Sequence, residues 1–406
     1  MTSSRSFGAD RLLLGSPLRQ RRYAIVVIIA LVLVLLFSVA MLFWSLGHLK
    51  PDVMRVYLSA LALASLLSLV PLAILRYLDR RERESTWLTA AAFLWGAVIA
   101  TGLALPLNNA ILRAVAAWLR ANPQIAEAVG GEAALLIGAP IAGPLVEETT
   151  KGLGLLVLFL LLRNEFDNAR DGLIYGALIG LGFNWVESAL YVAQGYAEYG
   201  VAPYGQQLGG RFALFGLAGH ALYTGMFGAF LGLARQTPRR WAKIVLPLLG
   251  LSLAIMAHAW NNGLGLLVVI VSGKPLPAPS APRPISIPVG LLQSSLLYAV
   301  IFFPFLLLLI LLIWRSGLWE RRVIQRELAG EVGGAVTPEE YEAVRRDGIL
   351  RTRRIARTAP RRSKALVNAQ HELAFRKYGV TAAGGDPEAD PLVAGWRTEI
   401  AKLRAQ

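Results

Sequence analysis

Long apolar segments alternate with short polar ones along most of this chain. The apolar segments lie at 23–47, 53–77, 88–108, 133–162, 172–195, 211–234, 244–271 and 288–314. Each approaches or exceeds the length of about 20 residues that a helix needs to cross the hydrocarbon core of a bilayer. The pattern therefore predicts an all-α fold, a polytopic membrane bundle of about eight transmembrane helices with a short helical tail.

Basic residues gather in alternate loops between these segments. They precede the first segment and follow the second, sixth and eighth, whereas the loops 48–52, 196–210 and 272–287 carry few. Because cytoplasmic loops of membrane proteins are enriched in Lys and Arg, we expect both termini in the cytoplasm. The loop 109–132 departs from this pattern, since Arg113 and Arg120 lie in a segment typical of an amphipathic helix at the membrane interface.

Five regions follow from these patterns. We expect a basic cytoplasmic N-terminus at 1–22, and the first three spans with the interfacial segment at 23–132. A core of four spans follows at 133–271. A proline-rich external loop with the last span lies at 272–314, and a basic cytoplasmic tail at 315–406. The first span is expected to be an uncleaved anchor, because it is long for a signal peptide and no small-residue cleavage site follows it.

The tail carries two recognisable local patterns. Thr337 followed by Pro338 and acidic residues predicts the start of a helix. His371 and Glu372 begin like the helix motif of zinc proteases, but Phe375 stands where the second histidine belongs, so we expect no metal site there.

Composition narrows the class of protein further. The chain of 406 residues is 55% hydrophobic, with a mean hydropathy of +0.51, which is too apolar for a soluble globular protein. The net charge of +15 is concentrated in the tail and the cytoplasmic loops, which indicates attraction to anionic lipid headgroups rather than nucleic acid. The absence of cysteine excludes disulfides, thiolate nucleophiles and cysteine-ligated metals.

Three charged residues interrupt the apolar segment 133–162. They are Glu147, Glu148 and Lys151, and each ionised group costs about 2.5–3.5 kcal/mol at the middle of a bilayer. On a helix Lys151 lies on the side of both glutamates, so the charges can neutralise one another. Gly143 and Pro144 directly precede them. We therefore expect a break in the helix, with Glu147 in the first turn after it.

The next three spans carry further polar residues at a similar depth. Glu187 and His220 lie about 8–9 residues from the external end of their spans, and Glu147 and His258 about 13–14, which corresponds to roughly 12–21 Å below the outer surface. Each of these residues alone is compatible with simple helix packing, as are Asn184, Asn261 and Asn262. Their convergence in one layer favours a single buried site.

Two hydrolytic chemistries suit this set of residues. In the first, a glutamate is the general base for a water molecule, and His with Asn stabilises the oxyanion. In the second, His220, His258 and Glu187 hold a divalent metal such as zinc while another glutamate acts as base. The spans contain no HExxH motif, no Gly-x-Ser-Gly nucleophile paired with a membrane histidine and no GxGD aspartates, so serine and aspartyl mechanisms are disfavoured.

The ordered motifs resemble a known family. They are the EExxK motif at 147–151, the FxxxE motif at 183–187, a histidine in each of the next two spans, and the stretches 171–176 and 220–224. In these motifs the chain is similar to the PrsW family of intramembrane proteases, over roughly residues 133–265. The wider superfamily includes the CAAX-processing proteases and the scaffold subunit of gamma-secretase. The resemblance implies a bacterial cell-membrane protein that makes the first cut in a single-pass substrate of the anti-sigma-factor type.

The resemblance also implies roles for individual residues. Glu147 would be the base, and His258 with Asn262 would supply the oxyanion contacts. Glu187 stands where the related CAAX-processing pattern has a histidine, so its role as a second water ligand stays open. The full set of catalytic candidates is Glu147, Glu148, Lys151, Glu187, His220, His258 and Asn262.

Two other function classes account for the same buried residues. A non-catalytic membrane scaffold of the same superfamily would keep the polar core to bind a partner. A proton- or ion-coupled transporter would use buried acids and histidines as a relay. A transporter often shows inverted repeats, and the sequence shows none that we can detect.

Overall fold

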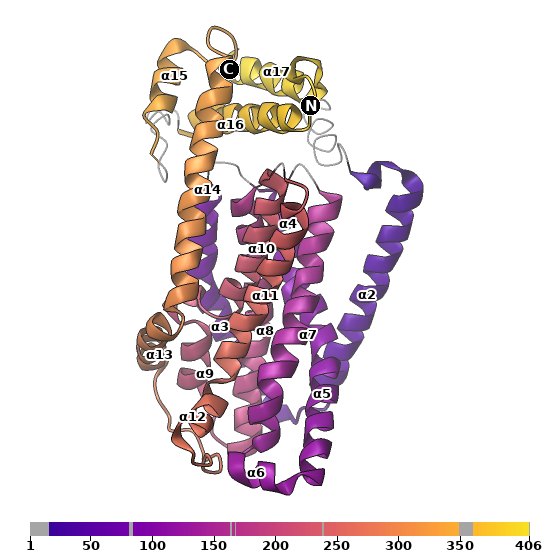
Figure 1. Ribbon diagram of the computed structural model, residues 1–406, viewed down its shortest axis with the longest axis vertical. Coiled ribbons are helices and arrows are strands. Elements are labelled where there is room, and N and C mark those ends of the chain that lie inside the picture. Colours follow the sequence, from indigo (N-terminus) through magenta and orange to yellow (C-terminus); the bar gives the residue numbers. More distant parts are fainter. Residues whose placement is uncertain are drawn as a thin grey trace. The chain divides into compact units, whose positions relative to one another are not determined.

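The computed structural model describes residues 16–80, 84–162, 165–166, 168–237, 239–348 and 360–405. Most of the expected basic N-terminus at 1–22 lies outside the described residues. Within the described residues the elements are helices, which confirms the predicted all-α class (Figure 1). In chain order the elements are η1 (Pro17–Arg19), α2 (Arg21–Gly47), α3 (Pro51–Leu78), α4 (Thr86–Leu94), η2 (Trp95–Ala100), α5 (Thr101–Ala121), α6 (Pro123–Val129), α7 (Ala133–Leu161), α8 (Ala169–Tyr199), α9 (Tyr204–Arg211), η3 (Leu214–Gly216), α10 (His220–Gln236), α11 (Ala242–Asn262), α12 (Leu264–Ser272), α13 (Ile287–Ile301), α14 (Phe303–Ala329), α15 (Pro338–Arg345), α16 (Pro360–Ala382), η4 (Pro387–Ala389) and α17 (Pro391–Ala405).

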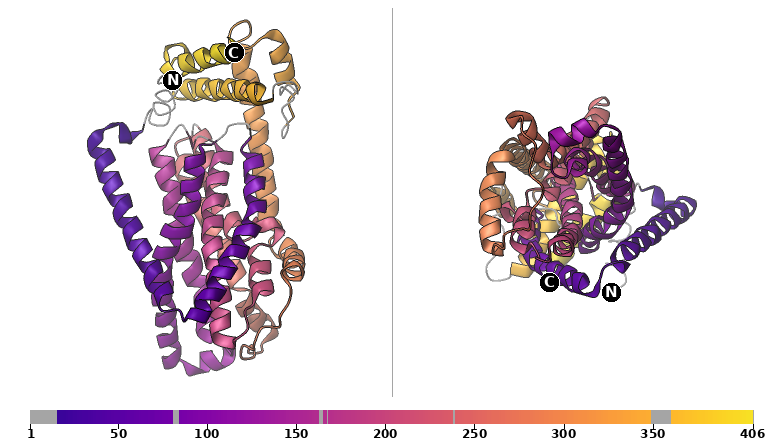
Figure 2. Two further views of the ribbon diagram at one scale, coloured as in Figure 1. Left: turned by 180° about the vertical axis from the view of Figure 1, so that it is seen from behind. Right: turned by 90° about the horizontal axis from the view of Figure 1, so that it is seen from below.

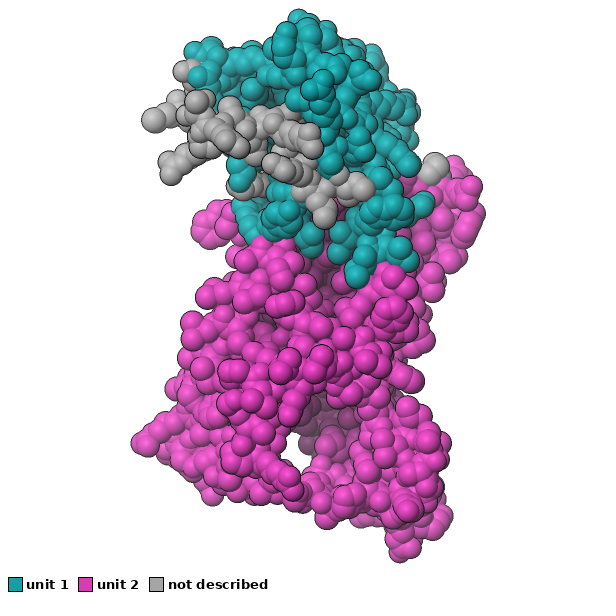
Figure 3. All heavy atoms as spheres, turned by 90° about the vertical axis from the view of Figure 1, so that its left-hand side faces the viewer, with its two compact units in different colours: residues 1–14, 76–84, 310–406 teal, residues 15–75, 85–309 magenta. Residues whose placement is uncertain are grey.

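The chain divides into two compact units, coloured separately in Figure 3. The membrane unit comprises Gly15–Leu75 and Ser85–Leu309, and the tail unit comprises Met1–Leu14, Arg76–Glu84 and Ile310–Gln406. All of the predicted catalytic residues belong to the membrane unit. Helix α14 continues through the expected boundary between the last span and the tail at 314/315 and ends at Ala329.

Seven helical stretches in the described part of the chain are long and apolar enough to cross a membrane. They are Arg21–Gly47, Pro51–Leu78, Thr86–Ala121, Ala169–Tyr199, Leu214–Gln236, Ala242–Asn262 and Phe303–Ala329. Helix α7 is comparably long at 29 residues, but its three charged side chains lower its hydropathy, and it is not among the seven. The protein is therefore a multi-pass membrane protein. The expected eighth span is divided at Phe302 between α13 and α14.

The segment expected to be an interfacial amphipathic helix is continuous with the third span. Residues Thr86–Ala121 form one helical stretch through α4, the π-helical η2 and α5, and Arg113 and Arg120 lie in its last turns. Pro106 lies inside α5 without ending it. A neighbouring helix can satisfy the backbone groups that such a proline leaves free in a membrane.

The predicted break before Glu147 is wrong. Helix α7 runs without interruption from Ala133 to Leu161, with Pro140 and Pro144 both inside it. Each proline removes one intrahelical hydrogen bond, but packing against α5 and α11 holds the segment helical. Glu147 therefore lies in the middle of a helix and not at a helix N-terminus.

Helix α8 is the buried centre of the membrane unit, and it packs most extensively against α10. Gly172, Gly176 and Gly180 form a stripe at i, i+4 and i+8 along α8. A Cβ atom added at these glycines would lie 1.9, 2.3 and 2.2 Å from backbone oxygens of α10. Such close helix contact through small residues is typical of membrane bundles. It brings the first residue of α10, His220, against the middle of α8.

Helix α2 lies at the edge of the membrane unit, as Figure 2 shows. Its apolar side chains are exposed around most of its circumference, which is expected for a helix surrounded by lipid. It contacts the rest of the unit where the backbone of Ser38 lies against Gly102 of α5.

The tail unit has its own core. Val336, Leu373 and Val393 are fully buried there, among residues from α14, α16 and α17. The predicted helix start at Thr337 is confirmed, because Thr337 and Glu340 form a capping box at the beginning of α15. His371 lies in α16, and the described tail contains no cluster of residues able to hold a metal ion.

Candidate active site

A cavity of about 390 Å³ lies among α5, α7, α8, α9, α10 and α11 in the membrane unit. Its wall includes five of the seven predicted catalytic residues, namely Glu147, Glu187, His220, His258 and Asn262. Glu148 and Lys151 lie behind this wall, one and four residues after Glu147 on α7, and are buried. The structure therefore brings all seven residues together at one place.

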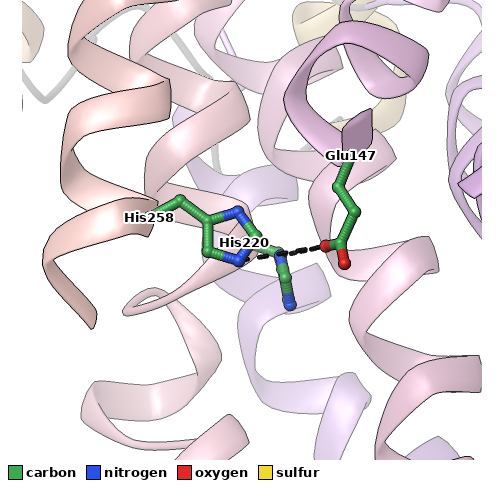
Figure 4. Close-up of side chains that lie close together, drawn as sticks. All are labelled: Glu147, His220 and His258. Atoms are coloured by element: carbon green, nitrogen blue, oxygen red, sulfur yellow. Dashed lines mark ion pairs between the residues drawn. The ribbon is translucent and has the colours of Figure 1, made fainter. Parts of the chain in front are cut away.

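Glu147 holds one carboxylate oxygen in a hydrogen bond and leaves the other free. Asn108 of α5 donates from Nδ2 to Glu147 Oε1 at 2.9 Å. Glu147 Oε2 is buried and has no hydrogen-bond partner. It lies 3.9 Å from Nε2 of His258 and 3.9 Å from Nδ1 of His220. Figure 4 shows the three side chains converging from α7, α10 and α11.

The partners of the two histidines define which ring nitrogen carries the proton. An ionised carboxylate only accepts hydrogen bonds. Glu148 Oε1 lies 2.9 Å from Nδ1 of His258, so that nitrogen donates and Nε2 keeps its lone pair. Glu187 Oε2 lies 2.7 Å from Nε2 of His220, so Nδ1 keeps the lone pair in that ring. Both lone-pair nitrogens are the ones that face Glu147.

Lys151 compensates the buried negative charge. Its side chain is fully buried, and Nζ donates to Glu148 Oε1 at 2.5 Å and lies 3.8 Å from Glu147 Oε2. Nζ also lies 2.9 Å from Nδ1 of His220 and 4.4 Å from the centre of the Phe183 ring. Glu148 accepts a further hydrogen bond from Thr224 at 2.9 Å. The expected supporting pair of Glu148 and Lys151 is therefore formed.

Glu187 is paired with a residue that the sequence analysis did not include. Arg211, the last residue of α9, donates from Nη1 to Glu187 Oε2 at 2.5 Å. The Arg211 backbone oxygen accepts from Asn184 at 3.1 Å, and its guanidinium lies over the Tyr191 ring. Arg211 was detectable as an isolated basic residue at the external end of a span, where the loop pattern has few.

Asn262 lies where α11 approaches α7. Its Nδ2 donates to the backbone oxygen of Ala139 at 3.2 Å, and its Oδ1 accepts from Asn261. A Cβ atom on Gly143 would lie 3.0 Å from Asn262 Nδ2, 3.4 Å from Glu147 Oε1 and 3.7 Å from His258 Nε2. Glycine at 143 therefore leaves room for these polar atoms to gather beside α7.

The residues best placed for a metal differ in one member from the expected set. Glu147, His220 and His258 each offer a ligand atom within 4.8 Å of the others, all three buried. Glu187, the expected carboxylate ligand, is engaged by Arg211 and His220 instead. Asn108 and Thr224 were also missed, because which residues face Glu147 and Glu148 depends on which helices pack beside α7.

Comparison with known proteins agrees with this geometry. The model of the family described as PrsW family intramembrane metalloprotease matches residues 84–309, more than half of the chain and further toward the N-terminus than the motifs alone indicated. Protease PrsW of Geobacillus kaustophilus (strain HTA426) is 29% identical over 112 residues, which cover 26% of this chain and 45% of that relative. The match thus spans less than half of the relative's length. No solved structure matches the chain. The arrangement of the EExxK, FxxxE and histidine motifs around one buried cavity, together with the family match, shows that the chain belongs to the PrsW family of intramembrane metalloproteases.

Proposed function

We propose that this protein hydrolyses a peptide bond of a single-pass membrane protein at the cavity beside Glu147. The observation that carries the proposal is the free oxygen of that glutamate. Glu147 Oε2 is buried without a hydrogen-bond partner and faces the lone-pair nitrogens of two histidines on the wall of a cavity. A buried, unsatisfied carboxylate oxygen is costly and therefore points to a ligand.

The residues present fit a divalent metal ion. Two histidines and one carboxylate are a common donor set for catalytic zinc. Three carboxylates face only two cationic side chains in the site, so a positive ion would balance the charge. Glu148 orients His258 through Nδ1 in the manner of the outer partners that support metal-bound histidines. The Nδ1 lone pair of His220, which would bind the metal, also faces Lys151 Nζ. We therefore propose that Lys151 Nζ contacts only Glu148 when the metal is bound.

In this proposal Glu147, His220 and His258 hold the ion. When bound, the ion would supply Lewis-acid polarisation of the scissile carbonyl group and make water a stronger acid. The tautomer of His258 favours this ligand role over donation to an oxyanion, because a neutral ring with a proton on Nδ1 has no proton on Nε2.

The protein's own residues supply the remaining steps. Glu147 offers Oε2 to the ion, while Asn108 holds Oε1 in place. An amide nitrogen carries two hydrogens, and Asn262 donates one of them to Ala139. Its second hydrogen is available to the carbonyl oxygen of the substrate as negative charge develops. Lys151 and Arg211 balance the charge of the other two carboxylates and hold them in place.

The substrate class is also part of the proposal. The family resemblance implies a first cut in a membrane-anchored anti-sigma factor. The loop charges support a site in the external half of the membrane, with both termini in the cytoplasm. A cut there would separate the external part of a single-pass protein from its anchor.

The test is reconstitution of the full-length protein in liposomes with single-pass membrane proteins, anti-sigma factors first. Wild type is compared with Glu147→Gln, His258→Ala and the matched control Glu127→Gln, which alters an exposed glutamate of α6. We expect cleavage to fall by about a hundredfold or more in the first two variants and to persist in the control. Cleavage by Glu147→Gln at the wild-type rate would refute the catalytic role of Glu147. If the wild-type protein cleaves none of these substrates, the result would favour a non-catalytic membrane scaffold.

A further inference from the structure

A second hollow continues the site cavity along the boundary between α5 and α7. It has a volume of about 620 Å³, and three residues, Asn109, Leu112 and Leu135, line both spaces. Arg113 of α5 and Glu132, just before α7, lie at its far end. Helices α5 and α7 lie side by side (Figure 1). The two hollows therefore form one groove that leads to Glu147.

The groove follows one face of each helix. On α5 its wall includes Thr101, Leu105, Asn108, Leu112 and Ala116, which are spaced by three or four residues and so share a face. The stretch from 101 to 116 is about 22 Å long on a helix. A peptide in extended conformation covers that length with about seven residues.

The opposite wall, on α7, has the same regularity. Leu135, Ala139, Gly143 and Glu147 recur at every fourth residue, so a line of mostly small side chains ends at the free carboxylate oxygen. Small side chains along this line leave space beside the helix backbone. A bulky group is least easily accommodated near Gly143, where Asn262 and His258 already lie close.

Polar groups on the α5 wall suit a peptide backbone better than a lipid chain. Asn108 Oδ1 is buried without a hydrogen-bond partner, although the same side chain donates from Nδ2 to Glu147. That oxygen can accept a hydrogen bond from a backbone N–H. Asn109 and the side chains of Arg113 and Glu132 at the far end add further polar groups, which an acyl chain would leave unsatisfied.

We propose that the groove between α5 and α7 binds the substrate as an extended segment of about seven residues, with small side chains next to the cut. This inference rests on the proposed function. A helical substrate keeps its amide groups in intrahelical hydrogen bonds, so the segment must unwind before Glu147 can act on it. The α5–α7 groove provides a line along which the unwound backbone runs.

The absence of cysteine from the chain allows a direct test. Ala116→Cys places a thiol in the groove, and Ala117→Cys places one at the same height on the exposed side of α5. The two side chains point about 100° apart. Each full-length variant is assayed in liposomes before and after reaction with a bulky maleimide, with wild type treated in parallel.

We expect the adduct at 116 to lower kcat/KM by about tenfold or more, and the adduct at 117 to leave it within about twofold of the unmodified variant. A benzophenone maleimide at 116, in the inactive Glu147→Gln protein, should crosslink to the single-pass protein that wild type cleaves. The proposal that the groove binds the substrate would be refuted by equal inhibition at both positions, by unchanged cleavage with the adduct at 116, or by crosslinking to lipid alone. If the wild-type protein cleaves no substrate, the proposed function is refuted, and the substrate-binding role of the groove is refuted as well.

Discussion

Glu147 has a hydrogen bond at one carboxylate oxygen and none at the other, and the contact with Asn108 determines which oxygen is bonded. The Asn108 amide donates to Oε1 at 2.9 Å, so Oε2 is the atom that turns toward the two histidines. Asn108 lies on α5, outside the motifs that carry the family resemblance. Its role is to position the glutamate.

We predict that Asn108→Ala lowers kcat by about ten- to a hundredfold, the range expected from losing one hydrogen bond to a charged group. KM should rise by less than kcat falls, because the substrate loses only the hydrogen bond proposed for Asn108 Oδ1 and keeps its other contacts along the groove. Asn108→Gln keeps the donor and should recover part of the rate. Steady-state cleavage in liposomes measures this, with Asn122→Ala as the control, because Asn122 follows α5 and lines neither hollow. A loss confined to KM would contradict the positioning role.

Gly143 offers a second test at the scale of single residues. We predict that Gly143→Ala keeps α7 helical but pushes Asn262 and the Glu147 carboxylate apart, since its Cβ would lie 3.0 Å from Asn262 Nδ2. Cleavage should fall by about tenfold or more, as expected when catalytic groups are displaced. The thermal midpoint of unfolding, measured on the same sample, should shift by only a few degrees. An equally active variant would show that the close approach is not needed.

Part of the site is predictable from the sequence at this scale. Charged residues inside apolar segments are costly, so Glu147, Glu148, Lys151 and Glu187 stand out without any structure. Arg211 and Asn108 do not, because one lies at a span end and the other is a neutral amide. Their roles exist only once α9 and α5 are packed against the partners that they contact.

At the scale of helices, the contact between α8 and α10 fixes the distance between Glu187 and His220. The glycine stripe of α8 lets the backbones meet, and His220 is the first residue of α10. The sequence shows the glycines, but it does not show which helix they face. The error at Pro144 has the same origin: the sequence shows the proline, while the packing that keeps α7 continuous comes from its neighbours.

We predict that Gly180→Ala separates α8 from α10 and that Gly225→Ala does not. A Cβ at 180 would lie 2.2 Å from the backbone oxygen of His220, whereas a Cβ at 225 would meet its nearest neighbour at an ordinary 3.5 Å. Overpacking of this kind costs about 1–3 kcal/mol. Thermal unfolding in detergent and cleavage in liposomes should both be impaired for Gly180→Ala alone. Equal behaviour of the two variants would count against the close contact.

At the scale of the whole molecule, the tail unit is a small helical fold with its own ionic network. Glu331 accepts hydrogen bonds from Lys377 and Arg397, and Arg376 donates to Asp390. Burial alone would raise the pKa of the Glu331 carboxyl, yet the hydrogen bonds from Arg397 and Lys377 outweigh it and hold the pKa below its ordinary value. At Asp390, burial is likewise outweighed by Arg376 and the backbone N–H of Val393, so its pKa is also lowered.

We predict that the tail unit loses stability in acid. A carboxylate whose pKa is lower in the folded than in the unfolded state stabilises the fold above the unfolded pKa, and this contribution is lost as the pH falls through the folded pKa. The loss should begin below about pH 4. Hydrogen exchange of α16 and α17 in the full-length protein should rise there, and less steeply in Asp390→Asn than in the exposed control Glu342→Gln. Identical acid profiles for the two variants would contradict the network's role.

The architecture was more accessible from the sequence than its details. Apolar segments of membrane length establish the bundle, because lipid imposes helices on any spanning chain. The tail's fold was not predictable beyond its first capping box, since its core joins α14, α16 and α17 across a long stretch of sequence. The division of the last apolar segment at Phe302 and the extension of α14 to Ala329 depend on packing in the same way.

We propose that Glu147, His220 and His258 form a metal-dependent peptidase centre. The most direct measurement is metal content and cleavage on the same reconstituted full-length protein, before chelation, after chelation and after zinc is restored. We predict that wild type loses cleavage with its metal and regains both, and that Glu147→Gln and His258→Ala retain less metal throughout. Undiminished cleavage by wild-type protein that has been shown to contain no metal would contradict the account.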